Sequence, residues 1–350
     1  MANQSQFDYI IVGQGIAGSV LAYSLLKENK KIMVIDEPSL SCSSKIAAGL
    51  YNPVVFKRLV KSWKADQVLP FADFFYKEIE SFFHKEIYFK KPIIKIFSEE
   101  NEKDFWIKKT ESDVGKYLSK KITKEYVDQI NSPLGSAEVK ESGYLDVALF
   151  LHLIRNYIKE TSSIIEEKFE YSYLNISNNQ IKYRNTIARK IIFCEGFKAT
   201  ENPFFNWLPF KLTKGEILIL RINNFNPEQV INKGVFILPL GEDLFKVGAT
   251  YEWNDLNEQP SARGKSELIE KLSAVLKIPF TVVDHKAGIR PTVNDRRPLI
   301  GLHPKHNEIG IFNGMGTKGV MLSPYFAKQF VDYLEKNLSL DKEVDINRFN

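Results

Sequence analysis

Glycines near both ends of the chain have the spacing of nucleotide-binding turns. In the segment GQGIAG, Gly13, Gly15 and Gly18 form a G-x-G-x-x-G pattern between a short apolar run and a helical repeat. The first glycine of such a pattern permits a tight turn, the second lets the backbone approach a pyrophosphate, and the third lets helix and strand pack closely. The free N–H groups and the dipole at the helix N-terminus attract phosphate. The segment predicts a dinucleotide site, and a strand–helix turn without a ligand is the alternative interpretation.

Residues suited to the same site follow directly in the sequence. Asp36 comes at the end of the next apolar run and would accept hydrogen bonds from the hydroxyls of an adenosine ribose. The segment SSKIAAGLYNP (43–53) offers small residues that let backbone N–H groups crowd a ligand, and serine hydroxyls for a phosphate. An ordinary small-residue loop is the alternative interpretation of this segment.

A second glycine-rich turn, GMGTKG (314–319), opens a helix near the other end of the chain. Glycine destabilises a helix, so this density of glycines suggests that a ligand approaches closely. An isoalloxazine ring gains negative charge on reduction, which a helix N-terminus and Lys318 would stabilise. Nucleotide-type turns at both ends of one chain therefore predict that it folds back on one long cofactor, FAD. A helix start that merely tolerates glycine is the alternative interpretation.

Arg290, in the segment GIRP, is the candidate for substrate recognition. A guanidinium binds a carboxylate through two parallel hydrogen bonds, which a lysine amine does not do. A surface ion pair is the alternative interpretation of this arginine.

The segment FKRLVKSWK (56–64) is predicted to place its cations on one helical face. A solvated face is one interpretation, and contact with phosphates, including those of RNA, is the other. The cations are Lys57, Arg58, Lys61 and Lys64.

A βαβ unit must position the first glycine-rich turn. Tyr9–Val12 and Ile32–Ile35 are continuous apolar runs, as expected of buried parallel strands. Between them, apolar residues recur at helical spacing. Further helices are predicted over 71–83, with a core-facing aromatic stripe, over Gly143–Tyr157, and around Phe326–Leu334. Further strands are predicted at Ile181–Ile187, Arg189–Cys194, Lys211–Arg221, Gly234–Pro239, Leu244–Thr250 and Gly310–Asn313.

The order of these elements predicts an α/β fold (α+β overall) with two domains interleaved in sequence. A Rossmann-like FAD-binding domain with a mostly parallel sheet is expected over 1–87, 141–205 and 284–350. A substrate domain with an antiparallel sheet is expected over 88–140 and 206–283.

Composition excludes several classes of protein. The net charge of +5 over 350 residues is weak evidence for nucleic-acid binding. Cys42 and Cys194 lie far apart in the sequence and have no metal-binding or redox spacing, so we predict a reduced, cytoplasmic setting and no metal site. We expect neither a signal peptide nor a membrane span.

Taken together, these motifs resemble one known family. The fingerprint, the loop from Ser43, the segments VGATYEWN (247–254) and GIRPTVNDRRPLIG (288–301), and the closing turn are similar to the D-amino acid oxidase superfamily of flavoproteins. Glycine oxidases and the FAD domain of the bifunctional enzyme that makes 5-methylaminomethyl-2-thiouridine in tRNA are the most similar branches. The resemblance implies oxidation of an amine that carries a nearby carboxylate. Because neither cysteine lies near the closing motifs, we predict non-covalent FAD.

The resemblance also implies which residues form the site. Arg290 would hold the substrate carboxylate, with Lys318 and Tyr251 as further catalytic candidates. Together with the fingerprint glycines, the cofactor-binding candidates are Ile16, Ala17, Asp36, Glu37, Ser43, Ser44, Ala48, Gly49, Leu50, Phe169, Gly196, Gly314, Met315, Gly316, Thr317, Lys318, Gly319, Val320 and Met321.

Two departures from glycine oxidases concern the substrate. Thr317 stands where those enzymes have a second arginine, and Phe236 stands where they supply a tyrosine hydroxyl, for which Tyr251 is a candidate replacement. We therefore expect hydride transfer to flavin N5 from an amino acid or an N-carboxymethyl amine, with oxygen or a quinone as the electron acceptor. Removal of a carboxymethyl group from a tRNA wobble uridine, and flavin binding without turnover, are the alternatives.

Overall fold

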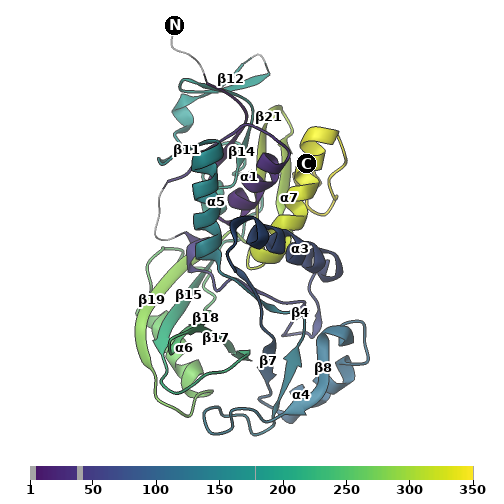
Figure 1. Ribbon diagram of the computed structural model, residues 1–350, viewed down its shortest axis with the longest axis vertical. Coiled ribbons are helices and arrows are strands. Elements are labelled where there is room, and N and C mark those ends of the chain that lie inside the picture. The colour runs from purple at the N-terminus through teal and green to yellow at the C-terminus, as the bar shows by residue number, and fades with distance from the viewer. Residues whose placement is uncertain (1–4, 38–41, 178, 350) are drawn as a thin grey trace. The chain divides into compact units, whose positions relative to one another are not determined.

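The computed structural model describes residues 5–37, 42–177 and 179–349, and the chain divides into two compact units (Figure 1). Unit 1 comprises Met1–Lys45, Val147–Thr213 and Ile289–Asn350, and unit 2 comprises Ile46–Asp146 and Lys214–Gly288. Each unit has its own many-stranded sheet, so the predicted mixed α/β class is confirmed. The division places 46–87, which we expected in the FAD-binding domain, in unit 2.

Unit 1 is built on a sheet whose strands run in the order β11-β2-β1-β14-β13-β12, with β21 beside β14 and β20 beside β21. β1 pairs in parallel with both β2 and β14, and β14 pairs in parallel with β21. The strands are β1 (Ser5–Val12), β2 (Ile32–Ile35), β11 (Ser163–Ile165), β12 (Leu174–Ser177), β13 (Gln180–Tyr183), β14 (Thr186–Phe193), β20 (Leu299–His303) and β21 (His306–Asn313).

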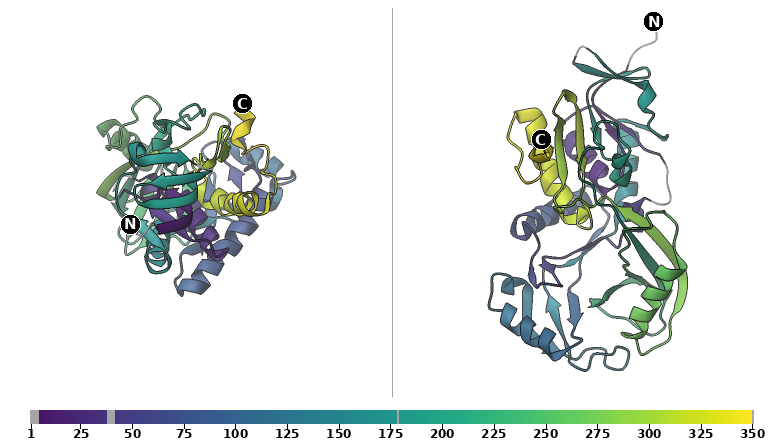
Figure 2. Two further views of the ribbon diagram at one scale, coloured as in Figure 1. Left: turned by 90° about the horizontal axis from the view of Figure 1, so that it is seen from above. Right: turned by 180° about the vertical axis from the view of Figure 1, so that it is seen from behind.

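Three helices of unit 1 lie side by side against this sheet (Figure 1): α1 (Ile16–Lys27), α5 (Val147–Thr161) and α7 (Gly319–Lys336). All four residues of β2 are buried, as are Tyr9 to Val12 of β1, because these strands are covered. Phe312 of β21 stacks on Phe330 of α7, and both views of Figure 2 show that helix beside the strand pair β20–β21. Shorter helical segments are α2 (Ser43–Ile46), η2 (Tyr171–Tyr173), η3 (Gly196–Thr200) and η4 (Ile346–Phe349).

The single strand expected over Ile181–Ile187 is wrong, because a turn interrupts it. Tyr183 pairs with Thr186 across a two-residue connection, and Arg184 adopts φ +50° there. The chain therefore reverses between β13 and β14, and Ile187 belongs to the second strand.

Unit 2 contains an eight-stranded sheet in the order β19-β15-β18-β17-β16-β7-β9-β8, a three-stranded sheet β3-β10-β6 and the hairpin β4-β5. The β17–β18 hairpin closes at Glu242 and Asp243, both at positive φ, as expected of a type I′ turn. Its helices are α3 (Ala65–Phe83), α4 (Glu100–Lys109), η1 (Gly115–Tyr117) and α6 (Ala262–Ser273). Its strands are β3 (Leu50–Tyr51), β4 (Val54–Val55), β5 (Val60–Lys61), β6 (Tyr88–Lys90), β7 (Ile93–Ile96), β8 (Leu118–Thr123), β9 (Ser136–Val139), β10 (Gly143–Leu145), β15 (Thr213–Arg221), β16 (Val230–Lys233), β17 (Val235–Gly241), β18 (Leu244–Gly248) and β19 (Thr281–Arg290).

Three expectations for unit 2 and its junction are wrong. The helix predicted over Gly143–Tyr157 begins only at Val147, because Gly143–Leu145 pairs as β10 with β3 and β6. The segment 56–64 is a hairpin turn followed by β5, so its cations share no helical face. The aromatic stripe of α3 is only partly core-facing, since Phe74 is 66% exposed and Phe82 is 52% exposed.

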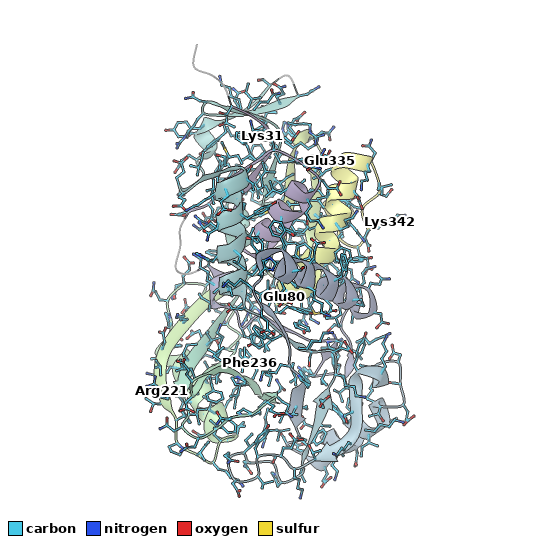
Figure 3. All side chains as sticks on the ribbon, in the orientation of Figure 1. Lys31, Glu80, Arg221, Phe236, Glu335 and Lys342 are labelled. Carbon is cyan, nitrogen blue, oxygen red and sulfur yellow. The ribbon has the colours of Figure 1, made fainter. Side chains whose placement is uncertain are left out.

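A half-buried carboxylate ties α7 to the sheet of unit 1. Glu335, labelled in Figure 3, accepts hydrogen bonds from the Tyr9 hydroxyl of β1 and from Arg189 of β14, and it pairs with Lys30. The Glu335 side chain is only 11% exposed. The network fixes the helix whose N-terminal turn is the second glycine-rich motif.

Replacing Glu335 with Ala should lower the free energy of unfolding of unit 1 by roughly 1–3 kcal/mol, because Tyr9 and Arg189 lose their shared acceptor. The loss stays in this range because the two cations, Arg189 and Lys30, remain partly solvated. Chemical denaturation followed by far-UV circular dichroism would measure the shift. Glu343→Ala is the matched control, because Glu343 forms an exposed pair with Arg297. Equal midpoints for the two variants would contradict this role.

Candidate functional site

The first glycine-rich turn packs too tightly for any side chain at two of its glycines. Gly13 has φ +95°, and a Cβ built there would lie 2.6 Å from the carbonyl oxygen of Cys194. A Cβ on Gly18 would lie 1.9 Å from the carbonyl oxygen of Gly13. Strand, turn and helix therefore meet backbone to backbone, which is the packing that the pattern predicts.

The N-terminus of α1 is available to an anion. Its N-cap residue, Gly15, provides no capping side chain, and the first turn holds no acidic residue. Ser44 approaches from the following loop and accepts a hydrogen bond from the Ile16 N–H at 3.0 Å. Backbone N–H groups and a serine hydroxyl at a helix start suit a phosphate group.

Asp36 lies directly after β2 and is held by groups of unit 1. Its Oδ1 accepts a hydrogen bond from the Gln14 backbone N–H at 2.8 Å, and its Oδ2 lies 2.9 Å from Nη1 of Arg155 on α5. Glu37 is exposed and pairs with Lys198, which holds the pKa of that carboxyl below its usual value. Of the two predicted acids, Asp36 is the one held by the glycine-rich turn and by α5.

The end of β14 adjoins the fingerprint. Gly196 follows at φ +60°, with open space where a Cβ would stand, and its carbonyl oxygen accepts a hydrogen bond from Asn313 Nδ2 at 2.8 Å. The neighbouring Glu195 carboxylate accepts hydrogen bonds from the Tyr171 hydroxyl and Asn202, both at 2.7 Å. Burial raises the pKa of the Glu195 carboxyl. Glu195 is not among the predicted site residues.

Phe169, a predicted cofactor contact, has its side chain in the core of unit 1. Its ring is buried in the core of unit 1, stacked on Tyr183 at 4.6 Å between centroids and edge-on to Phe193. Any contact of this residue with a cofactor would have to come from its backbone.

The closing turn adopts backbone conformations that favour glycine. Gly314 has φ +75°, and a Cβ there would lie 3.0 Å from the Leu299 backbone nitrogen. Met315 is buried and Thr317 is exposed, and α7 begins at Gly319 with no side chain capping it. Buried Val320 and Met321 then start the face of α7 that packs on the unit.

Lys318 is the half-buried cation at this helix start. Burial, together with the nearby positive charge of Arg296, lowers the pKa of its amine to about 8. Because that value is close to neutrality, the charge at the α7 N-terminus depends on pH.

The structure brings the two glycine-rich turns together. A Cβ built on Gly319 would lie 2.9 Å from Cγ2 of Ile16, so the first residues of α1 and α7 are in contact. Two helix N-termini whose N-cap residues provide no capping side chain thus lie side by side within unit 1, although they are separated by most of the sequence. One extended anionic ligand could contact both.

Arg290 ends β19, and its neighbour Thr292 adjoins the closing turn. Arg290 is half-buried, and its carbonyl oxygen accepts a hydrogen bond from the Thr292 N–H at 2.8 Å. Thr292 Oγ1 is buried, has no hydrogen-bond partner among the residues that the structure describes, and lies 3.9 Å from where a Cβ on Gly316 would stand. A buried hydroxyl that is not satisfied by protein groups suggests a ligand there. Sequence reasoning missed Thr292.

Most of the remaining predicted residues belong to unit 2. Ala48 and Leu50 pack at the edge of a hydrophobic cluster that also includes Phe236, and Gly49 between them has φ +70°. Tyr251 is 54% exposed and stacks on Trp253. Ser43, the start of α2, is half-buried in unit 1.

Lys246 of β18 is a candidate that the sequence analysis missed. Its amine donates a hydrogen bond to the Ala47 carbonyl oxygen at 3.0 Å, within the small-residue loop, and burial lowers the pKa of that amine. The sequence signal for this residue was a single lysine between Phe245 and Val247, two buried residues of the strand. Because side chains alternate along a strand, Lys246 lies on the opposite face of the sheet from these two.

The described part of the chain contains neither a candidate metal site nor a candidate membrane-spanning helix. Residues 5–37, 42–177 and 179–349 contain no cluster of His, Cys, Asp and Glu that could hold a metal ion. Within those ranges, no helix has the length and apolar character needed to cross a membrane.

Known proteins similar to this chain agree on one family. Residues 8–333 match the family described as DAO, FAD dependent oxidoreductase. Glycine oxidase of Bacillus licheniformis is 24% identical over 95% of this chain and 94% of that protein. The tRNA 5-methylaminomethyl-2-thiouridine biosynthesis bifunctional protein of Marinobacter nauticus is 19% identical over 92% of this chain and 54% of that protein. Iminodiacetate oxidase from Chelativorans sp. BNC1 has a similar fold, with a TM-score of 0.79, 17% identity, and coverage of 96% and 98%.

The residues present fit the cofactor of that family. Two adjoining helix starts whose N-cap residues provide no capping side chain suit a pyrophosphate-linked ligand, and Asp36 suits a ribose. The unsatisfied hydroxyl of Thr292 beside the closing turn suits a polar ligand edge. With this geometry and a match over nearly its whole length, the chain belongs to the DAO family of FAD-dependent oxidoreductases.

Proposed function

We propose that the protein oxidises the C–N bond of an amino acid or of an N-carboxymethyl amine. The observation that carries the proposal is Arg290, a half-buried arginine two residues before the unsatisfied hydroxyl of Thr292. Glycine oxidase and iminodiacetate oxidase, whose names give amine substrates with a carboxylate, support this substrate class. When bound, FAD supplies the two-electron oxidising chemistry.

Each part of the cofactor is assigned to a different element of unit 1. The N-terminus of α1 and Ser44 hold the pyrophosphate, and Asp36 holds the ribose. The start of α7, with Lys318, faces the redox-active ring and stabilises negative charge there. Gly196, Gly314 and the backbone from Met315 to Met321 complete the contacts.

Arg290 acts as the substrate anchor. A carboxylate bound through two parallel hydrogen bonds has one orientation, so the neighbouring C–N bond is aligned for reaction. A substrate that enters with its amine deprotonated needs no general base from the protein. Orientation therefore supplies much of the rate.

The substrate is proposed to differ from free glycine. Phe236 offers no hydroxyl, and its ring packs 3.1 Å from where a Cβ on Gly248 would stand. Tyr251 is exposed and remains a candidate for substrate contact. Cytoplasmic location, and oxygen or a quinone as electron acceptor, belong to the same proposal.

A carboxymethyl group on tRNA is the second candidate substrate. It needs the same C–N chemistry, and the similarity to the bifunctional tRNA-modifying protein favours it. A tRNA gel-shift assay at low salt, with Lys57 and Arg58 replaced by Ala as the comparison, would test it. No retention of tRNA by the parent protein would exclude this substrate.

The substrate class is tested by mixing the oxidised holoenzyme anaerobically with glycine, sarcosine, proline, iminodiacetate and D-amino acids. We expect at least one of them to bleach the visible flavin band. Admitting oxygen or a quinone afterwards identifies the acceptor by the return of the band. No bleaching by any amine that carries a carboxylate would contradict the proposal.

Replacing Arg290 with Ala should raise the KM for the carboxylate substrate about 10- to 100-fold, since charge-assisted hydrogen bonds are lost. The flavin content of the purified protein should not change. Arg297→Ala is the control, because Arg297 lies in the same segment and forms an exposed pair with Glu343. An unchanged KM in steady-state kinetics would rule out the anchor role.

Replacing Lys318 with Met should lower the reduction potential of the bound flavin at pH 7 by roughly 30 mV, the equivalent of about 1.4 kcal/mol. The amine is protonated below its pKa of about 8 and loses its charge above it. The difference between parent and variant should therefore be full at pH 7 and shrink above pH 8. Lys328→Met is the control, because Lys328 lies on the same helix and pairs with Asp332. Identical reduction potentials of the parent protein and Lys318→Met at pH 7 would mean that the flavin ring does not lie near Lys318.

A further inference from the structure

We propose that Arg155 of α5 is a positioning residue for the adenosine end of the cofactor. Its guanidinium fixes the Asp36 carboxylate in the orientation that accepts the ribose hydroxyls. This inference goes beyond the proposed substrate and does not depend on it. It rests on the assignment of Asp36 as the ribose acceptor, which the experiment below tests separately.

Arg155 contacts both the predicted acid and the glycine-rich turn. Its Nη1 lies 2.9 Å from Asp36 Oδ2, and the same nitrogen donates to Oε1 of Gln14, the residue between Gly13 and Gly15. The side chains of Arg155 and Asp36 are only 20% and 19% exposed. The ion pair is therefore shielded more than a surface pair, and its geometry is fixed.

The contacts leave Asp36 able to accept more hydrogen bonds. Its Oδ1 receives the Gln14 N–H at 2.8 Å, and its Oδ2 receives the arginine. An ionised carboxylate has about four acceptor positions, so roughly two remain for the ribose hydroxyls. A carboxylate held from two directions cannot rotate away from that orientation without breaking a charge-assisted bond.

Arg155 is itself held in place by a second acid. Its Nε donates to Oε1 of Glu166 at 3.1 Å, and Lys159, one helical turn further along α5, lies 2.8 Å from the same oxygen. Glu166 directly follows β11, which pairs in parallel with β2, the strand that ends before Asp36. Two neighbouring strand ends thus present one acid each to the same guanidinium. A lysine amine has no fork with which to bridge them.

The test measures binding by the holoenzyme. Dilution of the holoenzyme releases FAD, and the fluorescence of the released FAD gives its Kd. Competition with ADP then gives the affinity for the adenosine half of the cofactor alone. We expect Arg155→Gln to weaken FAD and ADP by the same factor, roughly 10- to 100-fold, while the visible spectrum of the FAD-saturated protein stays unchanged. Arg155→Lys should restore part of the affinity. Arg184→Gln, which breaks an exposed pair with Glu167, is the matched control and should change neither constant.

Three results would overturn the proposal. An FAD Kd for Arg155→Gln within twofold of the parent value excludes any positioning role. A weaker FAD Kd with unchanged ADP affinity, or with an altered flavin spectrum, means that the arginine acts on the fold as a whole. If Asp36→Asn leaves both constants unchanged, the ribose assignment fails, whatever Arg155 does. None of these readouts depends on which amine the enzyme oxidises.

Discussion

The fold of unit 1 depends on backbone groups that approach one another without side chains between them. Gly18 allows α1 to cross the end of β1, and Gly13 allows the same turn to lie against the end of β14. Any methyl group at either position would occupy space already filled by a carbonyl oxygen. The helix N-terminus is therefore held at the edge of the parallel strands, where a ligand can reach it, and Asp36, Ser44 and the closing turn lie around this point.

Electrostatic pairing supports that arrangement at both ends of the unit. Beside the first glycine-rich turn, Arg155 lies between Asp36 and Glu166. Near the C-terminal end of α7, Glu335 joins β1, β14 and a lysine. Lys318 differs from these, because it contributes a charge that burial makes costly. A costly cation at a helix start is typical of functional sites, whereas the paired charges stabilise the frame around it.

Much of this unit could be predicted from local sequence. The glycine spacing, the apolar runs of β1 and β2 and the acid at Asp36 follow from rules that act within a few residues, and the match to a known family agrees with them. Helix boundaries could be predicted less well from local sequence. Gly143 to Leu145 have an apolar pattern compatible with a helix, and they form a strand only because they pair with β3 and β6. Arg155, Thr292 and Lys246 were missed for the same reason. Their significance comes from neighbours distant in sequence, which composition and periodicity do not reveal.

The interleaving of the units has a consequence for biosynthesis. The chain makes β1, α1 and β2 first, continues through 101 residues of unit 2 (46–146), and adds the strand β21 and the helix α7 only after a second excursion. Until those last elements emerge from the ribosome, the edge of β14 and one side of α1 lack their neighbours. A nascent chain arrested before α7 therefore exposes apolar strand and helix surfaces to chaperones or proteases.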